Sequence, residues 1–254
     1  KGVTLTHQYV QTDSNGDVDT TLIVEDSLIQ SVIGGTAFTI TDRATLTLRR
    51  SIIRDYISQE YDIEGEVVSL GGTGINLNRQ SSALLENVWI ENGSKGIFLS
   101  KKDDPTWRAS VEAHQVVMSD VEKPVIGNDY ATISLNDAVF LNIGDEPSHS
   151  GIHTFNADIS GERLYFDIDP NAWAAVNFEE SNVSLSDIIL SGGMQGAKFI
   201  GDSSAEISRA LIKDQIGTGL EIVGLNNFAV ISDLLIENVG LQGLMVEKAT
   251  VTLE

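Results

Sequence analysis

The sequence predicts an all-β solenoid in which about ten similar coils, each of three short strands, stack into one rod. The first observation is an internal repeat, which three segments show openly: ATLTL at 44–48, ATISL at 131–135 and ATVTL at 249–253. The other two observations are apolar residues that alternate at period two and turns rich in Gly, Asn and Asp between them. Repeats of roughly 20 to 50 residues are typical of solenoids, and alternation at period two is typical of strands.

The repeat can be followed along nearly the whole chain from its first core position, which we call a. Successive a positions are separated by 24, 37, 28, 22, 26, 24, 22, 24 and 22 residues. Most coils therefore hold roughly 22–28 residues, and the interval of 37 indicates an insertion loop at about 56–72. The a positions are Leu22, Leu46, Ala83, Val111, Ile133, Ile159, Val183, Ala205, Ala229 and Val251.

Each coil reads as three strands in a fixed order. The first strand has apolar residues at a and a+2, and the second has apolar residues around a+5 to a+7. The third strand follows a glycine, as in Gly74–Leu77 and Gly219–Ile222, where apolar and other residues alternate. The turns between them leave no room for an amphipathic helix, so parallel strands must follow one another directly.

Position a+9 predicts a repeated turn. Asn and Asp tolerate the left-handed backbone conformation and hydrogen-bond to nearby backbone, so we expect them to stabilise a bend there. We expect these side chains to bond to turn backbone in the neighbouring coil, at about 1 kcal/mol for each hydrogen bond. The residues are Asp55, Asn92, Asp120, Asn142, Asp214 and Asn238.

This combination of three strands and an Asx turn resembles the right-handed parallel β-helix, or pectin-lyase-like, superfamily, from about Leu22 to Leu253. The right hand agrees with the preferred sense of parallel strand crossovers. Ten coils spaced about 4.8 Å apart would form a rod of roughly 50 Å. We expect residues 1–254 to form one β-helix domain, an excerpt of a longer chain. The resemblance implies no single activity, because the superfamily includes polysaccharide lyases, glycoside hydrolases, phage tailspikes and adhesins.

The net charge of the chain argues against some classes of binding partner. The 37 Asp and Glu against 16 Lys and Arg give a net charge of −21, which argues against binding to nucleic acid or an anionic membrane. No apolar run approaches the roughly 20 residues of a transmembrane helix. Cysteine is absent, which excludes disulfides and thiol catalysis. We expect a secreted or cell-surface protein whose partner is a carbohydrate or a protein surface.

A candidate catalytic cluster lies in the turn around 144–153. It comprises Asp145, Glu146, His149 and His153. Histidines beside carboxylates can exchange protons near neutral pH or hold a divalent metal. The alternative is an ordinary solvated polar loop.

Two further loops are candidates for ligands. Asp103, Asp104, Trp107 and Arg108 form a polar and aromatic loop on which a sugar ring could stack. Asp13, Asn15, Asp17 and Asp19 place oxygen atoms at alternate positions, as calcium loops do. That segment departs from the full calcium-loop motif, since its glycine is fourth rather than sixth. Calcium is the cation that this segment would bind, and no cofactor is required. Plain surface turns are the alternative for both loops.

The exposed position of the third strand gives no pair of carboxylates of the kind a glycosidase needs. It holds Asn76, Phe98, Lys198, Glu221 and Met245. The sequence therefore favours a non-catalytic scaffold or adhesin-type region that recognises a ligand or carbohydrate. The alternative is a polysaccharide-active lyase or glycoside hydrolase of the same fold.

Position a+6 predicts an apolar stripe along the rod. If a+5 and a+7 fill the core, a+6 must point outward, because successive side chains of a strand alternate. The stripe would then be an interface for a second copy, another domain or another segment. The alternatives are a bend at a+5 that turns a+6 inward, and β-propensity alone. The stripe comprises Leu28, Ile52, Trp89, Val117, Val139, Tyr165, Ile189, Leu211 and Leu235.

Overall fold

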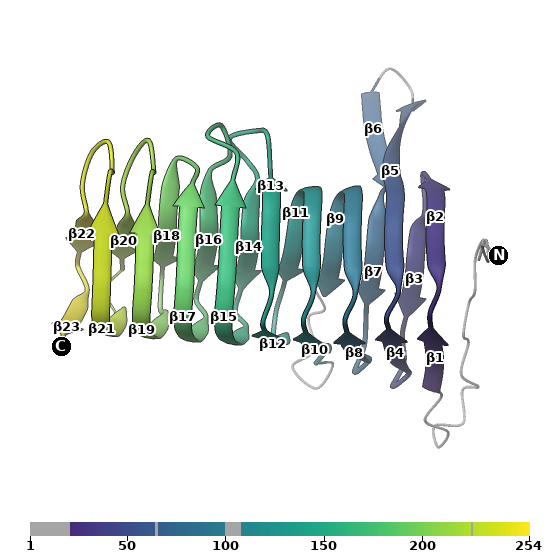
Figure 1. The fold of residues 1–254 in the computed structure, drawn as a ribbon, viewed down its shortest axis with the longest axis horizontal. Helices are drawn as coiled ribbons and strands as arrows, with labels where there is room; N and C mark the ends of the chain where they lie inside the picture. The colour runs from purple at the N-terminus through teal and green to yellow at the C-terminus, as the bar shows by residue number, and fades with distance from the viewer. Residues whose placement is uncertain (1–20, 64–65, 100–107, 225) are drawn as a thin grey trace.

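The computed structural model describes residues 21–63, 66–99, 108–224 and 226–254, and these form a right-handed parallel β-helix of about nine turns (Figure 1). The described residues contain strands and no helix, as predicted, and so no helix there could cross a membrane. Ten a positions enclose nine steps from coil to coil, which is why nine turns replace the ten coils that we expected.

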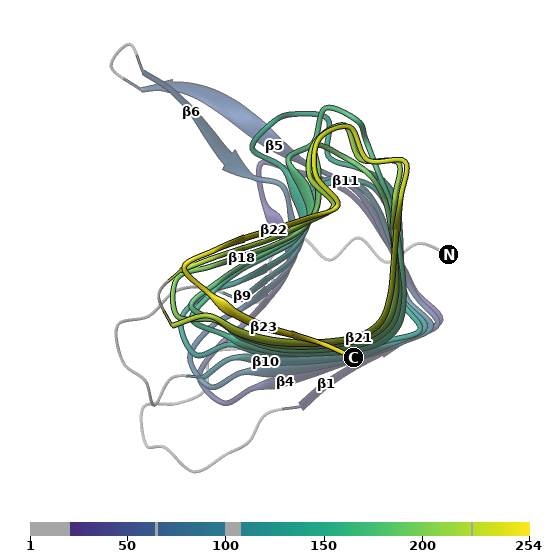
Figure 2. The same ribbon diagram turned by 90° about the vertical axis from the view of Figure 1, so that its left-hand side faces the viewer.

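The rod has a three-sided cross-section (Figure 2), and we call its sides faces A, B and C. Face A comprises β1 (Thr21–Glu25), β4 (Thr45–Arg49), β8 (Ser82–Glu86), β10 (Ser110–His114), β12 (Thr132–Asn136), the first halves of β15 (Asp158–Ile168), β17 (Asn182–Gly192), β19 (Ser204–Lys213) and β21 (Phe228–Glu237), and β23 (Thr250–Leu253). Face B comprises β2 (Leu28–Ile33), β5 (Ile52–Ile63), β13 (Val139–Ile143), the first halves of β9 (Trp89–Leu99) and β11 (Val117–Gly127), and the second halves of β15, β17, β19 and β21. Face C comprises β3 (Thr36–Ile40), β7 (Thr73–Leu77), β14 (Ser150–Phe155), β16 (Ala174–Glu179), β18 (Gln195–Ile200), β20 (Leu220–Val223), β22 (Leu244–Glu247) and the second halves of β9 and β11.

The register of face A confirms the repeat. Every predicted step pairs one a position with the next in parallel register, from Leu22 on Leu46 to Ala229 on Val251. Because the period of a strand is two, fixing this register also fixes which side chains enter the core on every coil.

Equivalent apolar side chains stack on one another inside the rod. The rings of Phe140 and Phe166 are parallel, with centroids 4.3 Å apart, and Phe178 lies 5.2 Å from Phe199. Tyr56 is fully buried, and burial raises the pKa of its hydroxyl. A solenoid core is thus a series of columns, each repeated at the spacing of the coils.

The insertion forms a hairpin. The end of β5 pairs antiparallel with β6 (Glu66–Gly71), from Ser58 opposite Gly71 to Ile63 opposite Glu66. The hairpin projects from the corner between faces B and C (Figure 2). It accounts for the long coil at the place predicted from the sequence, and the regular stacking continues on either side of it.

The corner between faces B and C contains the predicted a+9 turn. All six Asx residues there have a left-handed backbone, with φ between 51° and 62°. Their side chains bond to one another rather than to backbone: Asn238 Nδ2 donates to Asp214 Oδ1 at 3.2 Å, and Asn92 Nδ2 to Asp55 Oδ1 at 2.7 Å. We expected a bond from these side chains to turn backbone. The structure instead has a side-chain hydrogen bond from Asn on one coil to Asp on the coil before it, because the charged carboxylate is the stronger acceptor.

The corner between faces A and B contains a second left-handed column, at a+4, which the sequence reading missed. Arg50 donates two hydrogen bonds to Asp26, at 2.8 and 3.0 Å, and Arg209 donates two to Asp187, at 2.6 and 2.7 Å. The column alternates in charge over its last five coils. Its members are Asp26, Arg50, Asn87, Gln115, Asp137, Arg163, Asp187, Arg209 and Asp233.

Candidate functional site

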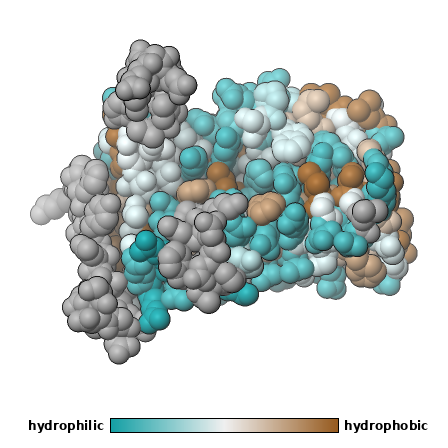
Figure 3. Space-filling model, turned by 180° about the vertical axis from the view of Figure 1, so that it is seen from behind, coloured by the Kyte–Doolittle hydropathy of each residue, from teal (hydrophilic) through white to brown (hydrophobic). Residues whose placement is uncertain are grey.

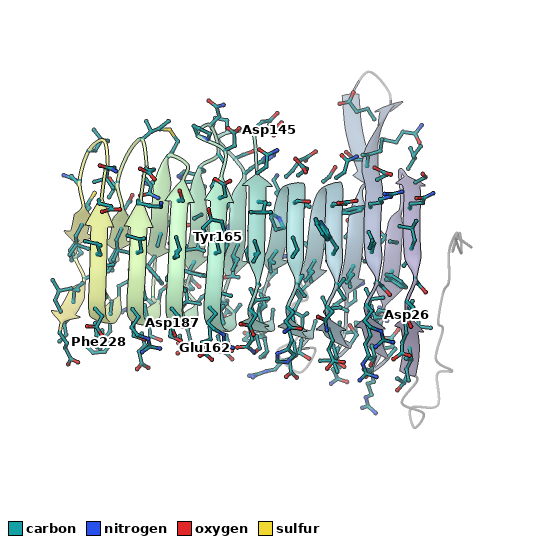
Figure 4. All side chains as sticks on the ribbon, viewed as in Figure 1. Asp26, Asp145, Glu162, Tyr165, Asp187 and Phe228 are labelled. Atoms are coloured by element: carbon teal, nitrogen blue, oxygen red, sulfur yellow. The ribbon has the colours of Figure 1, made fainter. Side chains whose placement is uncertain are left out.

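The predicted catalytic loop joins β13 to β14 at the corner of faces B and C (Figure 4). His149 is buried, whereas Asp145 and Glu146 are exposed. The Nδ1 atom of His149 lies 3.2 Å from Asp145 Oδ1, but the pair is not aligned as a hydrogen bond. The loop is held by backbone bonds, since the His149 carbonyl accepts from the Trp173 amide at 2.9 Å. This geometry places three of the four predicted residues together.

His153 faces a different carboxylate. It lies on β14, in the outward column of face C, and its Nε2 atom is 3.6 Å from Glu179 Oε1 of the next coil. Burial lowers the pKa of His153, and Glu179 opposes that effect. No ion pair within the described residues joins His153 to the 144–149 loop. A neutral imidazole beside a carboxylate can accept a proton near neutral pH.

A polar cluster continues along face C from His153. Lys198 Nζ lies 3.0 Å from Glu221 Oε1, and both side chains are less than one-fifth exposed. The same Nζ atom lies 5.2 Å from the centre of the Trp173 ring, while Gln195 donates to the other Glu221 oxygen. Figure 3 views this side of the rod, where hydrophilic side chains surround isolated hydrophobic ones. An ion pair so little exposed on an outer face is more than a solvated surface contact.

This cluster contains a buried amide that is only partly satisfied. Asn177 stacks between His153 and Lys198 in register and is fully buried. Its Nδ2 atom donates to Glu179 Oε1 at 3.3 Å, but its Oδ1 atom accepts no hydrogen bond from the described residues. The sequence analysis listed Lys198 and Glu221 at the exposed position of the third strand. It did not identify Asn177 and Trp173 as part of a site, because the residues that they contact lie on other coils.

Face A contains a groove of about 580 Å³ that crosses five coils. Its walls are the outward columns a−1 and a+1, and its floor is the backbone between them. Most of its exposed lining surface is apolar, although polar side chains stand on both walls. Phe228, which is 50% exposed, stands at one end. The lining residues are Thr132, Asp158, Ile159, Ser160, Asn182, Val183, Ser184, Ser204, Ala205, Glu206, Phe228 and Val230.

One wall of the groove is prearranged by hydrogen bonds along the rod. Ser204 Oγ donates to Asn182 Oδ1 at 2.7 Å, and Asn182 Nδ2 donates to Asp158 Oδ1 at 2.9 Å. On the opposite wall, the hydroxyls of Ser160 and Ser184 make no hydrogen bond within the described part of the chain. The groove therefore offers a fixed row of polar atoms beside free hydroxyls.

Arg108 links the predicted binding loop to this groove. It lines a smaller pocket of about 150 Å³ with Tyr130, Asn156, Ala157, Asp158 and Asn182. Its guanidinium lies 6.0 Å from the centre of the Tyr130 ring. Asp158 and Asn182 line both hollows, so the pocket adjoins the groove.

The other residues predicted for ligand binding lie outside the described residues. These are Asp103, Asp104 and Trp107 of the binding loop, and Asp13, Asn15, Asp17 and Asp19 of the calcium segment. In residues 21–63, 66–99, 108–224 and 226–254, no three His, Asp or Glu side chains group closely enough to hold a metal ion.

The a+6 residues form one continuous ridge on face B. They pair in register from Leu28 to Leu235. Residues at a+7 lie in the core, and Trp89 is 45% and Leu235 55% exposed. Tyr165 stands on the near side of β15 (Figure 4). The ridge therefore points outward, and the alternative of an inward bend is wrong.

Comparisons with known proteins add little to this geometry. No family model matches the chain, and no curated protein matches it. Among solved structures it is similar to the Agl-KA catalytic domain, with 8% identity and a TM-score of 0.24. That alignment covers 93% of this chain and 61% of the other. A similarity of this size carries no functional argument, and the superfamily resemblance rests on the β-helix alone.

Proposed function

We propose that the chain is a non-catalytic, secreted or cell-surface β-helix scaffold that recognises a carbohydrate along the groove of face A. The observation that carries this proposal is the groove itself. It crosses five coils, which corresponds to roughly 19 Å at about 4.8 Å per coil, and it lies open along the rod. A linear glycan could lie along it, meeting polar side chains on four coils and the ring of Phe228 on the fifth.

The chemistry of the lining favours a neutral glycan. Asp158 and Glu206 bring negative charge to the two walls, so a polymer of uronic acids would be repelled. Hydroxyls of Ser160 and Ser184 suit hydroxyl groups of a sugar, and the exposed ring of Phe228 offers an apolar platform. Arg108 at the far end supplies one cation, which does not cancel the acidic walls.

The test is a glycan array followed by titration calorimetry on the full chain. We expect binding to neutral glycans and a loss of at least tenfold in affinity for Ser184→Trp, which fills the groove. The matched control is Thr252→Trp, on the same column of face A but outside the groove lining. If no glycan binds, or if Ser184→Trp binds as the unmodified chain does, the groove is not the site.

The enzyme alternative rests on one specific observation, the face-C cluster of His153, Asn177, Glu179, Lys198 and Glu221. Such a cluster could move a proton during polysaccharide cleavage. The test is an activity screen on acidic and neutral polysaccharides, with and without calcium. If Glu221→Gln abolishes cleavage, the active site lies on face C. If Asp145→Ala abolishes it, the active site lies in the 144–149 loop.

A further inference from the structure

We propose that face B is a self-association surface on which two copies of this chain pair with their rods antiparallel. The ridge at a+6 runs along face B without a break, and every one of its nine members is at least partly exposed. Ile52, Trp89, Tyr165 and Leu235 are each at least 36% exposed. The largest apolar patch on a soluble protein is often a functional surface.

The small charge on face B allows a partner that is itself acidic. The outward columns beside the ridge, a+4 and a+8, each hold one anion more than they hold cations. Their net charge is thus about −2, against −21 for the whole chain. Two copies could therefore approach through this face with little charge repulsion.

The repeat of the ridge selects the kind of partner. Its side chains recur at about 4.8 Å, which another stack of parallel strands matches on every coil. A second copy supplies that spacing. If a two-fold axis lies along the strands, the rods run in opposite directions, and each column of one copy faces the same column of the other.

One register of this pairing matches both shape and charge. It places Ile52 against Leu235, Trp89 against Leu211, Val117 against Ile189 and Val139 against Tyr165. Both aromatic rings then meet an aliphatic side chain. In the a+8 column the same register places Arg54 against Glu237 and Glu91 against Lys213. By symmetry each of these opposite-charge contacts forms twice, and no like charges meet in that column.

The size of the face suits a dimer of moderate affinity. Eight overlapping coils span roughly 34 Å, and a five-residue strand spans about 16 Å. The product is about 500 Å² on each copy, near the lower limit of roughly 1,000 Å² in total for a specific interface. The hairpin of β5 and β6 projects away from face B (Figure 2), so it does not obstruct this approach.

The first test measures the mass of the full chain by sedimentation at several protein concentrations. We expect a concentration-dependent dimer, and a monomer for the double variant Trp89→Lys with Leu211→Lys. Its circular dichroism and any glycan binding should be unchanged, because face A lies elsewhere. A chain that is monomeric at every concentration would overturn the proposal without touching the proposed function.

The second test reverses partly exposed charges in the a+8 column. Glu237→Arg should raise the dimer dissociation constant at least tenfold. The new arginine of each copy would face Arg54 of the other, so two repulsive contacts would replace two attractive ones. Adding Arg54→Glu should restore the original value. The matched control is Glu112→Arg on face A, which should leave it unchanged. If the double charge reversal dimerises no better than Glu237→Arg alone, this antiparallel register is wrong.

Discussion

At the scale of the residue, the corners of the rod depend on side chains that accept a left-handed backbone. Asn and Asp do so at a+9, where their short side chains bond across coils. Arginine adopts the left-handed backbone conformation at a+4, although arginine, unlike Asn and Asp, has no general preference for it. Arg163 and Arg209 have φ values of 56° and 52°, and each guanidinium binds a carboxylate on the adjacent coil. Gln115 in the same column has φ 54°, so the corner imposes this conformation on several residue types.

We predict that Asn238→Ala destabilises the protein in two separable ways. The variant loses one hydrogen bond to Asp214, worth about 1 kcal/mol, and places alanine, which tolerates the left-handed region less well than asparagine, at φ 54°. That backbone conformation costs roughly 1 to 2 kcal/mol for alanine. Asn238→Gly loses only the hydrogen bond. Urea unfolding of the three proteins should rank them as Asn, Gly and Ala, and equal stabilities would show that the corner is not strained.

We predict that ion pairs in the a+4 column stabilise the fold at neutral pH and that this stabilisation is lost in acid. Hydrogen bonds from Arg50, Arg163 and Arg209 lower the pKa of Asp26, Asp137 and Asp187. A lowered carboxyl pKa stabilises the fold above the ordinary value near 3.8, and this contribution is lost as pH falls through the lowered pKa.

The measurement is the melting temperature between pH 6 and pH 2. It should fall less steeply in Arg209→Gln, which frees Asp187. A slope identical to that of the unmodified chain would show that these ion pairs contribute nothing to the acid transition.

At the scale of the element, the sequence predicted the columns in which one residue class recurs on each coil. It did not predict the contacts that occur only once or whose residue class changes from coil to coil. Columns a, a+6 and a+9 were found because one residue class recurs at a fixed offset, and their register is confirmed from Leu22 to Val251. The a+4 column escaped because Asp and Arg alternate there, so no single class recurs. The contact of His153 with Glu179 escaped for another reason: neither residue repeats, and 26 positions separate them. The groove escaped because its lining residues share no residue class from coil to coil.

We predict that the coil containing β9 requires glycine at position 93. A Cβ built there would lie 2.1 Å from Cε2 of the buried Tyr56 ring, so Gly93→Ala must displace it. Overpacking of this kind typically costs about 1 to 3 kcal/mol. Gly243→Ala is the matched control, because its nearest neighbouring atom is 3.8 Å away.

Thermal unfolding should show a large loss for Gly93→Ala and a small one for Gly243→Ala. The second change Tyr56→Leu should recover part of the loss, because it removes the ring that is in the way. A Gly93→Ala variant as stable as Gly243→Ala would mean that Tyr56 can move freely.

At the scale of the whole molecule, the three faces have separate chemistry on one scaffold. Face A has the groove, face B the apolar ridge, and face C the polar cluster around Glu221. Parallel stacking makes this separation possible, because each outward column belongs to one face along the entire rod. Substitutions on one face should therefore leave binding at the other two unchanged.

The alternating charges of the a+4 corner also restrict how the rod can change length. Removing residues 183–204 would take out one coil and place Ala205 on Ile159, with every core column intact. It would also bring Arg163 next to Arg209. Removing residues 159–204 takes out two coils and places Arg209 beside Asp137, so opposite charges still meet.

Solenoids of this kind should therefore gain or lose coils more readily in even numbers at this corner. Added salt screens repulsion between exposed charges, so it should raise the melting temperature of the one-coil deletion more than that of the two-coil deletion. The same response in both deletions would contradict this rule. If the rule holds, the alternation of charge at one turn decides whether a solenoid can grow by duplicating a single coil or only a pair of coils.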